Sequence, residues 1–209
     1  MNSNFDIKKE TVETLINIYK MQIPECQRKF VWIESKKKEL IESLIRNYPI
    51  GSLTLYNDKD DKTYLLVDGL QRYNTMYAYL RKPSEILNFN EYYSAANANK
   101  EISIFCKENN LLESKVKKSI KSWYEALETK KDEKYFAFEN MKNLLENLKS
   151  FDVLYSDIEN FQNLRSMLLK ILDIRNKTVA LIIYEGDKND LPDLFTKINK
   201  KNVSLTPYE

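Results

Sequence analysis

The chain has 209 residues, of which 43% are hydrophobic and 12% aromatic, and its 33 basic and 31 acidic residues leave a net charge of +2. This composition is typical of a folded domain with a substantial core, and it excludes both a disordered tail and a global basic field for nucleic acid. Histidine is absent, which excludes Ser-His-Asp triads, HExxH metal sites and HNH nuclease centres within this sequence. Chemistry here must therefore use carboxylates, Arg, Lys, amides or a bound metal.

Two cysteines, Cys26 and Cys106, are too few for a disulfide framework or a four-ligand zinc site. Residues 1–10 contain no apolar run suited to a signal peptide, and no stretch approaches the ~20 apolar residues of a membrane-spanning helix. We therefore expect a cytoplasmic protein that makes no contact with a membrane.

Apolar residues at helical spacing predict the first two helices. The first stripe is formed by Val12, Leu15, Ile16 and Tyr19, and the second by Leu40, Ile41, Leu44 and Ile45. A short strand is expected at residues 21–23, before Pro24. Ser35 is the expected N-cap of the second helix, because a serine hydroxyl can accept a hydrogen bond from the first turn.

Two β-rich runs, residues 52–56 and 64–67, are separated by the polar residues 57–61 and predict a hairpin. Three aspartates, Asp58, Asp60 and Asp61, could recruit a cation there, but an exposed hairpin tip is the simpler interpretation. The second run leads directly into Asp68 and Gly69. A third helix is then predicted, up to Pro83, by the stripe of Leu70, Tyr73, Tyr77 and Leu80.

From residue 83 to 176 the pattern becomes helical. One stripe is formed by Val116, Ile120, Trp123, Tyr124 and Leu127, and another by Phe138, Met141, Leu144, Leu145 and Leu148. Residues 178–184 predict a further strand, and the last helix is predicted by Leu191, Leu194, Phe195 and Ile198. We expect an α+β fold: a core of residues 1–82 with a small mixed sheet and flanking helices, a large helical insert of residues 83–176, and a return of the core over residues 177–209. We also expect the sequence to stop short of a C-terminal domain.

The junction of strand, turn and helix at Asp68 and Gly69 is the strongest candidate site. Gly69 permits close backbone approach, the first N–H groups of the helix attract anions, and Arg72 can add a bidentate fork to a phosphate. Asp68 could hold a divalent metal or orient water, and Gln71 could position a nucleophile or bind a ribose or base. Alternatively, Asp68 caps the helix and Arg72 forms an ion pair with it, so that the motif only braces the turn.

A second cluster, residues 26–32, places Gln27, Arg28 and Lys29 beside Phe30 and Trp32. Aromatic rings interleaved with cations suit base stacking combined with phosphate contacts. The two aromatic residues could equally be anchors of the core.

These segments occur in an order that resembles the GmrSD N-terminal family. The similar segments are I-P-x-x-Q-R-x-x-x-W at residues 23–32, residues 40–45 and 48–52, D-G-L-Q-R at residues 68–72, and F-x-x-I-N with a following L-T-x-x-E at residues 195–209. The resemblance implies a ParB/sulfiredoxin-like fold, a nucleotide-binding or nucleoside-triphosphatase role, and membership in a bacterial system that restricts modified or phage DNA. A nucleoside triphosphate would be the ligand, and magnesium could accompany it. The resemblance places the motifs on Gln27, Arg28, Asp68, Gly69, Gln71, Arg72 and Asn199.

The sequence departs from the family pattern at three positions. Leu70 stands where the family usually has Gln, which could weaken hydrolysis while leaving phosphate binding by Gly69 and Arg72. Cys26 replaces an aromatic residue, and Asn202 replaces a glycine in a position where Asn is well tolerated.

The leading hypothesis is therefore a nucleotide-binding, NTP-hydrolysing regulatory module of a bacterial anti-phage or modification-dependent restriction system. In it, Gln27, Arg28, Lys29, Gly69, Arg72 and Asn199 bind the nucleotide, and Asp68, Gln71 and Arg72 act on it. Contact with DNA would then run through a nuclease domain or subunit outside this sequence, and the module could oligomerise. The alternative hypothesis is a non-catalytic ParB-like module that senses DNA or nucleotide.

Overall fold

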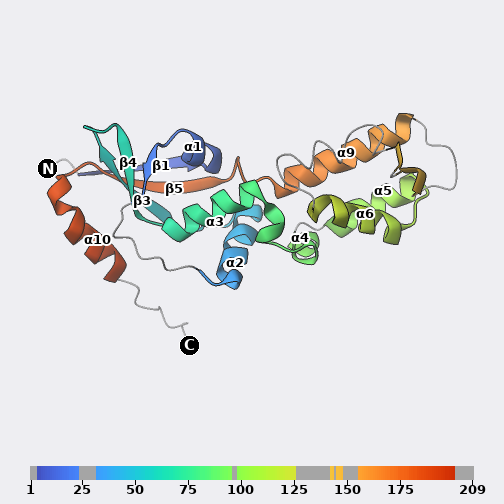
Figure 1. The fold of residues 1–209 in the computed structure, drawn as a ribbon, viewed down its shortest axis with the longest axis horizontal. Coiled ribbons are helices and arrows are strands. Elements are labelled where there is room, and N and C mark those ends of the chain that lie inside the picture. The colour runs from blue at the N-terminus through green and yellow to red at the C-terminus, as the bar shows by residue number, and fades with distance from the viewer. Residues whose placement is uncertain are drawn as a thin grey trace.

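The computed structural model describes residues 4–23, 32–95, 98–125, 142–143, 145–147 and 155–200. The molecule is elongated, with a β-sheet towards one end and a group of helices at the other (Figure 1). In chain order the elements are β1 (Phe5–Thr11), α1 (Val12–Asn17), β2 (Met21–Gln22), α2 (Glu34–Ile45), β3 (Ser52–Asp58), β4 (Thr63–Asp68), α3 (Leu70–Arg81), the 3-10 helix η1 (Pro83–Glu85), α4 (Phe89–Ala95), α5 (Ala98–Glu108), α6 (Glu113–Glu125), α9 (Tyr155–Leu172), β5 (Thr178–Tyr184), the 3-10 helix η2 (Lys188–Asp190) and α10 (Leu191–Lys200).

The sheet is mixed, and its five strands follow the order β1-β5-β3-β4-β2. β5 pairs antiparallel with β1 and parallel with β3, although it is far from both in the sequence. β4 pairs antiparallel with β3 and parallel with the short β2. The α+β prediction is thus confirmed, as is the hairpin formed by β3 and β4.

One face of the sheet carries the main core. Alternate residues of β3, β4 and β5 point to it, and they form one apolar cluster with buried side chains of α1, α2 and α3. The sheet residues concerned are Leu53, Leu55, Leu66, Val179, Leu181 and Ile183. Tyr56 and Val67 point to the opposite face and are also buried, outside that cluster. On the described part of the chain, α10 contacts β4.

The helices between α3 and β5 belong to the same continuous cluster. Trp123, Tyr124 and Phe161 are almost fully buried, and the rings of Tyr92 and Tyr124 stack with their centroids 4.7 Å apart. The hydroxyl of Tyr79 on α3 donates to the carbonyl of Leu172 at the end of α9. The stripe predicted for residues 116–124 is confirmed, whereas Leu127 and most of the stripe at residues 138–148 lie outside the described residues. The division of the chain into an α/β core and a helical insert of residues 83–176 stays a prediction.

Three local predictions were wrong. Ser35 does not cap α2, which begins at Glu34 after Ile33 without a side-chain cap. The third helix is confirmed as α3, and Leu70, Tyr73 and Leu80 pack against the core as predicted. The fourth residue of that stripe, Tyr77, is exposed, and the buried residues of α3 are Thr75, Met76 and Tyr79. The carboxylate of Asp58 is not exposed at the hairpin tip. It is buried and lies 2.6 Å from the amine of Lys188, which arrives with the chain after β5.

β1 was missed altogether. Its residues 5–9 are all exposed. The alternation of apolar and polar residues by which a half-buried strand is recognised covers only Phe5 to Lys8, before a polar run begins at Lys9.

Candidate functional site at the start of α3

The candidate site lies at the carboxyl end of β4, where the chain turns into α3, and the carboxyl end of β2 faces the same way. β4 ends at Asp68, and β2 runs parallel to it, so that both strands point their carboxyl ends the same way. Gly69 is the N-cap of α3 and adopts a φ of 96°, in the left-handed region. A Cβ atom at this position would lie 2.8 Å from Cγ of Leu53. Glycine is therefore required both by the backbone angle and by the packing against β3.

Arg72 lies in the first turn of α3 and ties three segments together. Its Nη2 donates to Oδ2 of Asp68 at 2.8 Å, and its Nη1 donates to the carbonyl of Ile50 at 3.5 Å. Gly51, with a φ of 80°, leaves the room that the guanidinium occupies, because a Cβ there would lie 2.6 Å from Nη1. The Arg72 side chain is 19% exposed and that of Asp68 35%, so the ion pair is open to solvent on one side.

Gln71 connects the start of α3 to the residues that precede α2. Its side-chain Oε1 accepts a hydrogen bond from the backbone N–H of Trp32 at 3.2 Å. The segment containing Gln27, Arg28 and Lys29 connects Ile23, next to β2, with Trp32. Those three residues lie outside the described residues, but the described residues on either side of them are attached beside β4 and α3.

The structure therefore brings Asp68, Gly69, Gln71 and Arg72 together, as predicted. The backbone of Asn199 is part of α10, but its side chain lies outside the described part of the chain. The bracing interpretation is half right: the ion pair between Asp68 and Arg72 exists, but the cap of α3 is Gly69 and no side chain caps the helix. Sequence reasoning missed the roles of the Ile50 carbonyl and Gly51, although residues 48–52 were among the segments that resemble the family.

The backbone at this helix start can receive an anion. The first helical hydrogen bond runs from the N–H of Tyr73 to the carbonyl of Gly69, so the N–H groups of Leu70, Gln71 and Arg72 have no partner within the helix. The helix dipole adds positive potential at this end. A guanidinium carries five N–H donors, and Asp68 and Ile50 account for two of those on Arg72.

Asp68 stays the predicted ligand for a magnesium ion. No group of three or more Cys, Asp or Glu side chains that could hold a metal ion converges within the described residues. Asp68 itself already accepts a hydrogen bond from Arg72. A magnesium ion at this site would need most of its oxygen ligands from phosphate groups and water, as is common for this ion.

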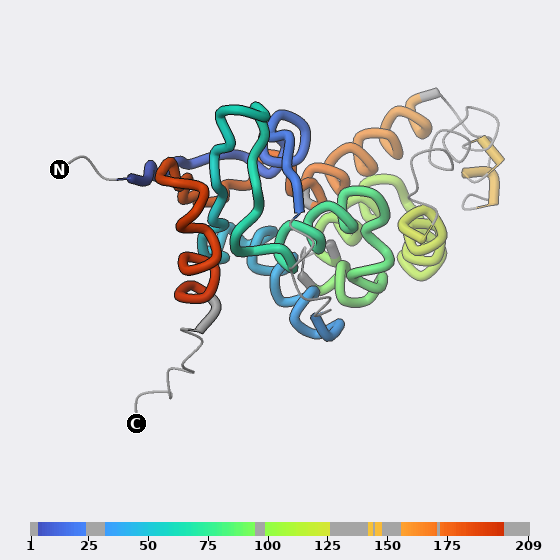
Figure 2. Tube along the Cα trace, turned by 60° about the vertical axis from the view of Figure 1, so that its left-hand side comes forward, coloured from blue at the N-terminus to red at the C-terminus, as the bar shows by residue number. Residues whose placement is uncertain are grey.

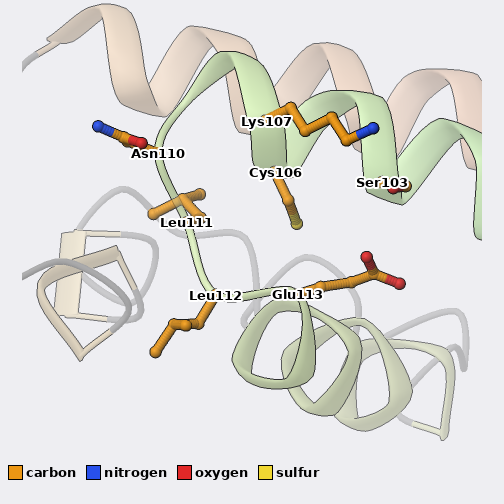
Figure 3. A pocket seen from close by; sticks show the side chains of 7 residues that line it. All are labelled: Ser103, Cys106, Lys107, Asn110, Leu111, Leu112 and Glu113. Atoms are coloured by element: carbon orange, nitrogen blue, oxygen red, sulfur yellow. The ribbon is translucent and has the colours of Figure 1, made fainter.

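A separate depression of about 370 Å³ lies in the helical part, between α5 and α6. Its lining residues are Ser103, Cys106, Lys107, Asn110, Leu111, Leu112 and Glu113 (Figure 3). Burial and the nearby Glu113 raise the pKa of the Cys106 thiol, which disfavours the reactive thiolate at neutral pH. None of these residues belongs to the site at the start of α3, and we assign no function to the depression.

Comparison with known proteins identifies the family. The model of the GmrSD restriction endonuclease N-terminal domain matches residues 12–209. The chain belongs to this family. The match begins at the first residue of α1, so β1 lies outside it.

Within this GmrSD N-terminal domain, all four predicted residues of the Asp68–Arg72 motif lie in the matched region. The chain is also similar to the uncharacterized protein MJ0686 of Methanocaldococcus jannaschii, with 23% identity over 226 aligned positions. That alignment covers 90% of this chain but only 37% of the relative. No solved structure matches the chain. None of the described helices is long and apolar enough to cross a membrane.

Proposed function

We propose that this GmrSD N-terminal domain is a nucleotide-binding regulatory module of a bacterial restriction or anti-phage system, and that it hydrolyses a nucleoside triphosphate. The observation that supports it best is the convergence on Arg72 of Asp68, the Ile50 carbonyl and Gly51 beside the first amides of α3. Cations and amide donors gathered at a helix start are the chemistry that recognises phosphate.

The attachment of the segment before Trp32 strengthens the proposal. Pairing of β2 with β4 holds one end of it, and the hydrogen bond from Trp32 to Gln71 holds the other. Arg28 and Lys29 lie between these anchors in the sequence, and their charges would complement the phosphates. In the proposed complex a phosphate group competes with Asp68 for Arg72, which releases the Asp68 carboxylate to orient water.

The restriction role follows from membership of the family. The sequence has no histidine for an HNH centre, so the nuclease of this proposal belongs to another domain or subunit. That partner, and contact with DNA through it, are part of the proposal. The chain spans about 37% of the length of the relative it matches, so the activity and the partners of the whole protein are likewise part of the proposal.

The first experiment compares thermal shifts of the wild type and of Gln71→Glu with each of the four common ribonucleoside triphosphates, with and without magnesium. Glutamate keeps an oxygen acceptor for the Trp32 N–H, so the fold should persist, while its negative charge repels phosphate. A ligand at 100 times its Kd stabilises the folded state by about 2.7 kcal/mol. We expect the wild type to show such a shift and the variant to lose most of it.

The matched control is Asn74→Asp, which adds the same charge to α3 at an exposed position. Its thermal shift should equal that of the wild type. The site assignment fails if Gln71→Glu keeps the full shift, and the nucleotide hypothesis fails if no triphosphate stabilises the wild type.

A second candidate, a sensing module without turnover, is favoured by a specific observation. The side chains of Asp68 and Gln71 are both engaged, by Arg72 and by the Trp32 amide, and Leu70 stands at the position of the family's other amide. Phosphate release distinguishes the two candidates. Nucleotide binding without release supports the sensor, whereas steady release that disappears in Asp68→Asn, which keeps an acceptor for Arg72, supports hydrolysis.

A further inference from the structure

β1 is an open edge of the sheet. β5 lies on one side of it, and among the described residues no strand lies on the other. Figure 2 shows β1 running from the N-terminal end of the tube beside β5. All residues from 5 to 9 are exposed, including Phe5 at 50% and Ile7 at 66%. A flat edge with exposed apolar residues is a template for pairing with another strand.

The backbone of β1 shows which groups such a partner would meet. The carbonyl of Asn4 accepts from the N–H of Glu185, and the N–H of Val12 donates to the carbonyl of Lys177. Both bonds continue the register of the β1–β5 pair beyond its two ends, where Phe5 faces Tyr184 and Thr11 faces Thr178. Because the direction of backbone groups alternates along a strand, the N–H and C=O groups of Ile7 and Lys9 point away from β5, towards the open edge.

The sequence of this strand complements itself. If two copies of β1 pair antiparallel about a two-fold axis at Ile7, Asp6 of each copy faces Lys8 of the other. Ile7 then faces its own copy, which covers an exposed apolar side chain. Asp6 and Lys8 form non-hydrogen-bonded pairs in this register, the closer type, in which opposite charges attract.

The neighbouring register is less favourable. With the axis at Lys8, that lysine would face its own copy and Asp6 would face Glu10, so that like charges oppose each other. Glu10 is also only half-exposed and accepts a hydrogen bond from the hydroxyl of Tyr19. The exposed stretch of residues 5–9 is centred on Ile7, which agrees with the first register.

We propose that β1 pairs with β1 of a second copy of this chain, antiparallel about Ile7, and that the sheet continues across both copies. Such a contact is isologous and closes as a dimer. It also brings together, from each copy, the apolar side chains that share one face of the sheet at this edge, namely Phe5, Ile7, Ile182 and Tyr184.

The test is sedimentation equilibrium of the wild type and of charge variants over a range of concentrations. Asp6→Lys places lysines opposite Lys8, and Lys8→Asp places aspartates opposite Asp6, so each variant should dimerise at least ten-fold more weakly than the wild type. The double variant Asp6→Lys/Lys8→Asp should regain the dimer. An equimolar mixture of the two single variants should form a mixed dimer, because each then meets its complement.

Both positions are exposed, with side chains at 59% and 44%, and melting curves verify that the variants stay folded. Lys118→Asp, an exposed position on α6, makes the same charge change away from β1 and should sediment like the wild type. A wild type that is monomeric at every concentration overturns the proposal. So does tighter association of Asp6→Lys, because that result indicates the register centred on Lys8.

Discussion

An ion pair between Asp58 and Lys188 joins the hairpin to the last part of the chain. The Asp58 side chain is 2% exposed, and it also accepts a hydrogen bond from the N–H of Asp61. The hydrogen bond from Lys188 is the largest cause that lowers the pKa of this carboxyl below its ordinary value. An aspartate with a lowered pKa stabilises the fold above its unfolded pKa, and this stabilisation is lost as the pH falls through the folded pKa.

We therefore predict that Asp58→Asn lowers the melting temperature at pH 7. The difference from the wild type should stay constant down to about pH 5 and shrink below about pH 4, near the unfolded pKa of aspartate. Scanning calorimetry at a series of pH values measures this. Asp60→Asn, at an exposed position of the same turn, is the control, and a difference that persists into strong acid would contradict the assignment.

At the scale of the elements, the two left-handed glycines decide how α3 meets the sheet. Gly51 precedes β3 and Gly69 begins α3, and the guanidinium of Arg72 lies against both. The position of α3 thus depends on contacts between residues about twenty positions apart in the sequence.

Replacing Gly51 or Gly69 with alanine should destabilise the fold. A side chain forced into the left-handed region carries a strain of about 1–3 kcal/mol, and each added Cβ would also meet an atom closer than 3.0 Å. Denaturant unfolding should show this loss for both variants. Asn74→Ala, on the exposed side of α3, should leave stability unchanged, and equal stability of all three variants would show that the glycines are not needed here.

The sequence was informative wherever one face of an element is buried. Apolar spacing predicted α2, the β3–β4 hairpin and β5, because each of them covers a continuous core. β1 was not recognised, since Phe5 and Ile7 are its only apolar residues, and an exposed edge strand is held by backbone hydrogen bonds and not by a continuous hydrophobic face. In the site, the Asp-Gly turn predicted where Asp68, Gly69, Gln71 and Arg72 would meet. The ion pair between Asp68 and Arg72 was predicted as the alternative interpretation and exists. The hydrogen bond from Arg72 to the Ile50 carbonyl could not be predicted, because a backbone carbonyl has no signature in the sequence.

For the whole molecule, the shared core indicates that the sheet and the helices unfold together. The apolar cluster runs without a break from β5 to α6 and α9, and the hydroxyl of Tyr79 donates across it to the carbonyl of Leu172 at 3.1 Å. Domains that share one core usually unfold in a single cooperative transition.

We predict one calorimetric transition, and we expect Tyr79→Phe to move all of it to lower temperature. This variant leaves the buried carbonyl of Leu172 without its donor, which costs about 1–3 kcal/mol. Tyr77→Phe, at an exposed position on the same helix, should melt like the wild type. Two separate transitions, or a shift of only part of the signal, would mean that the helical part folds independently.

The hydrogen bond between Trp32 and Gln71 also has an optical consequence. The sequence contains two tryptophans, and the structure gives them different surroundings. Trp32 is half-buried beside the start of α3, while Trp123 is sealed in the core of the helices. The emission of an indole depends on its surroundings, so the intrinsic fluorescence of this protein holds one reporter at the candidate site and one built-in reference in the core.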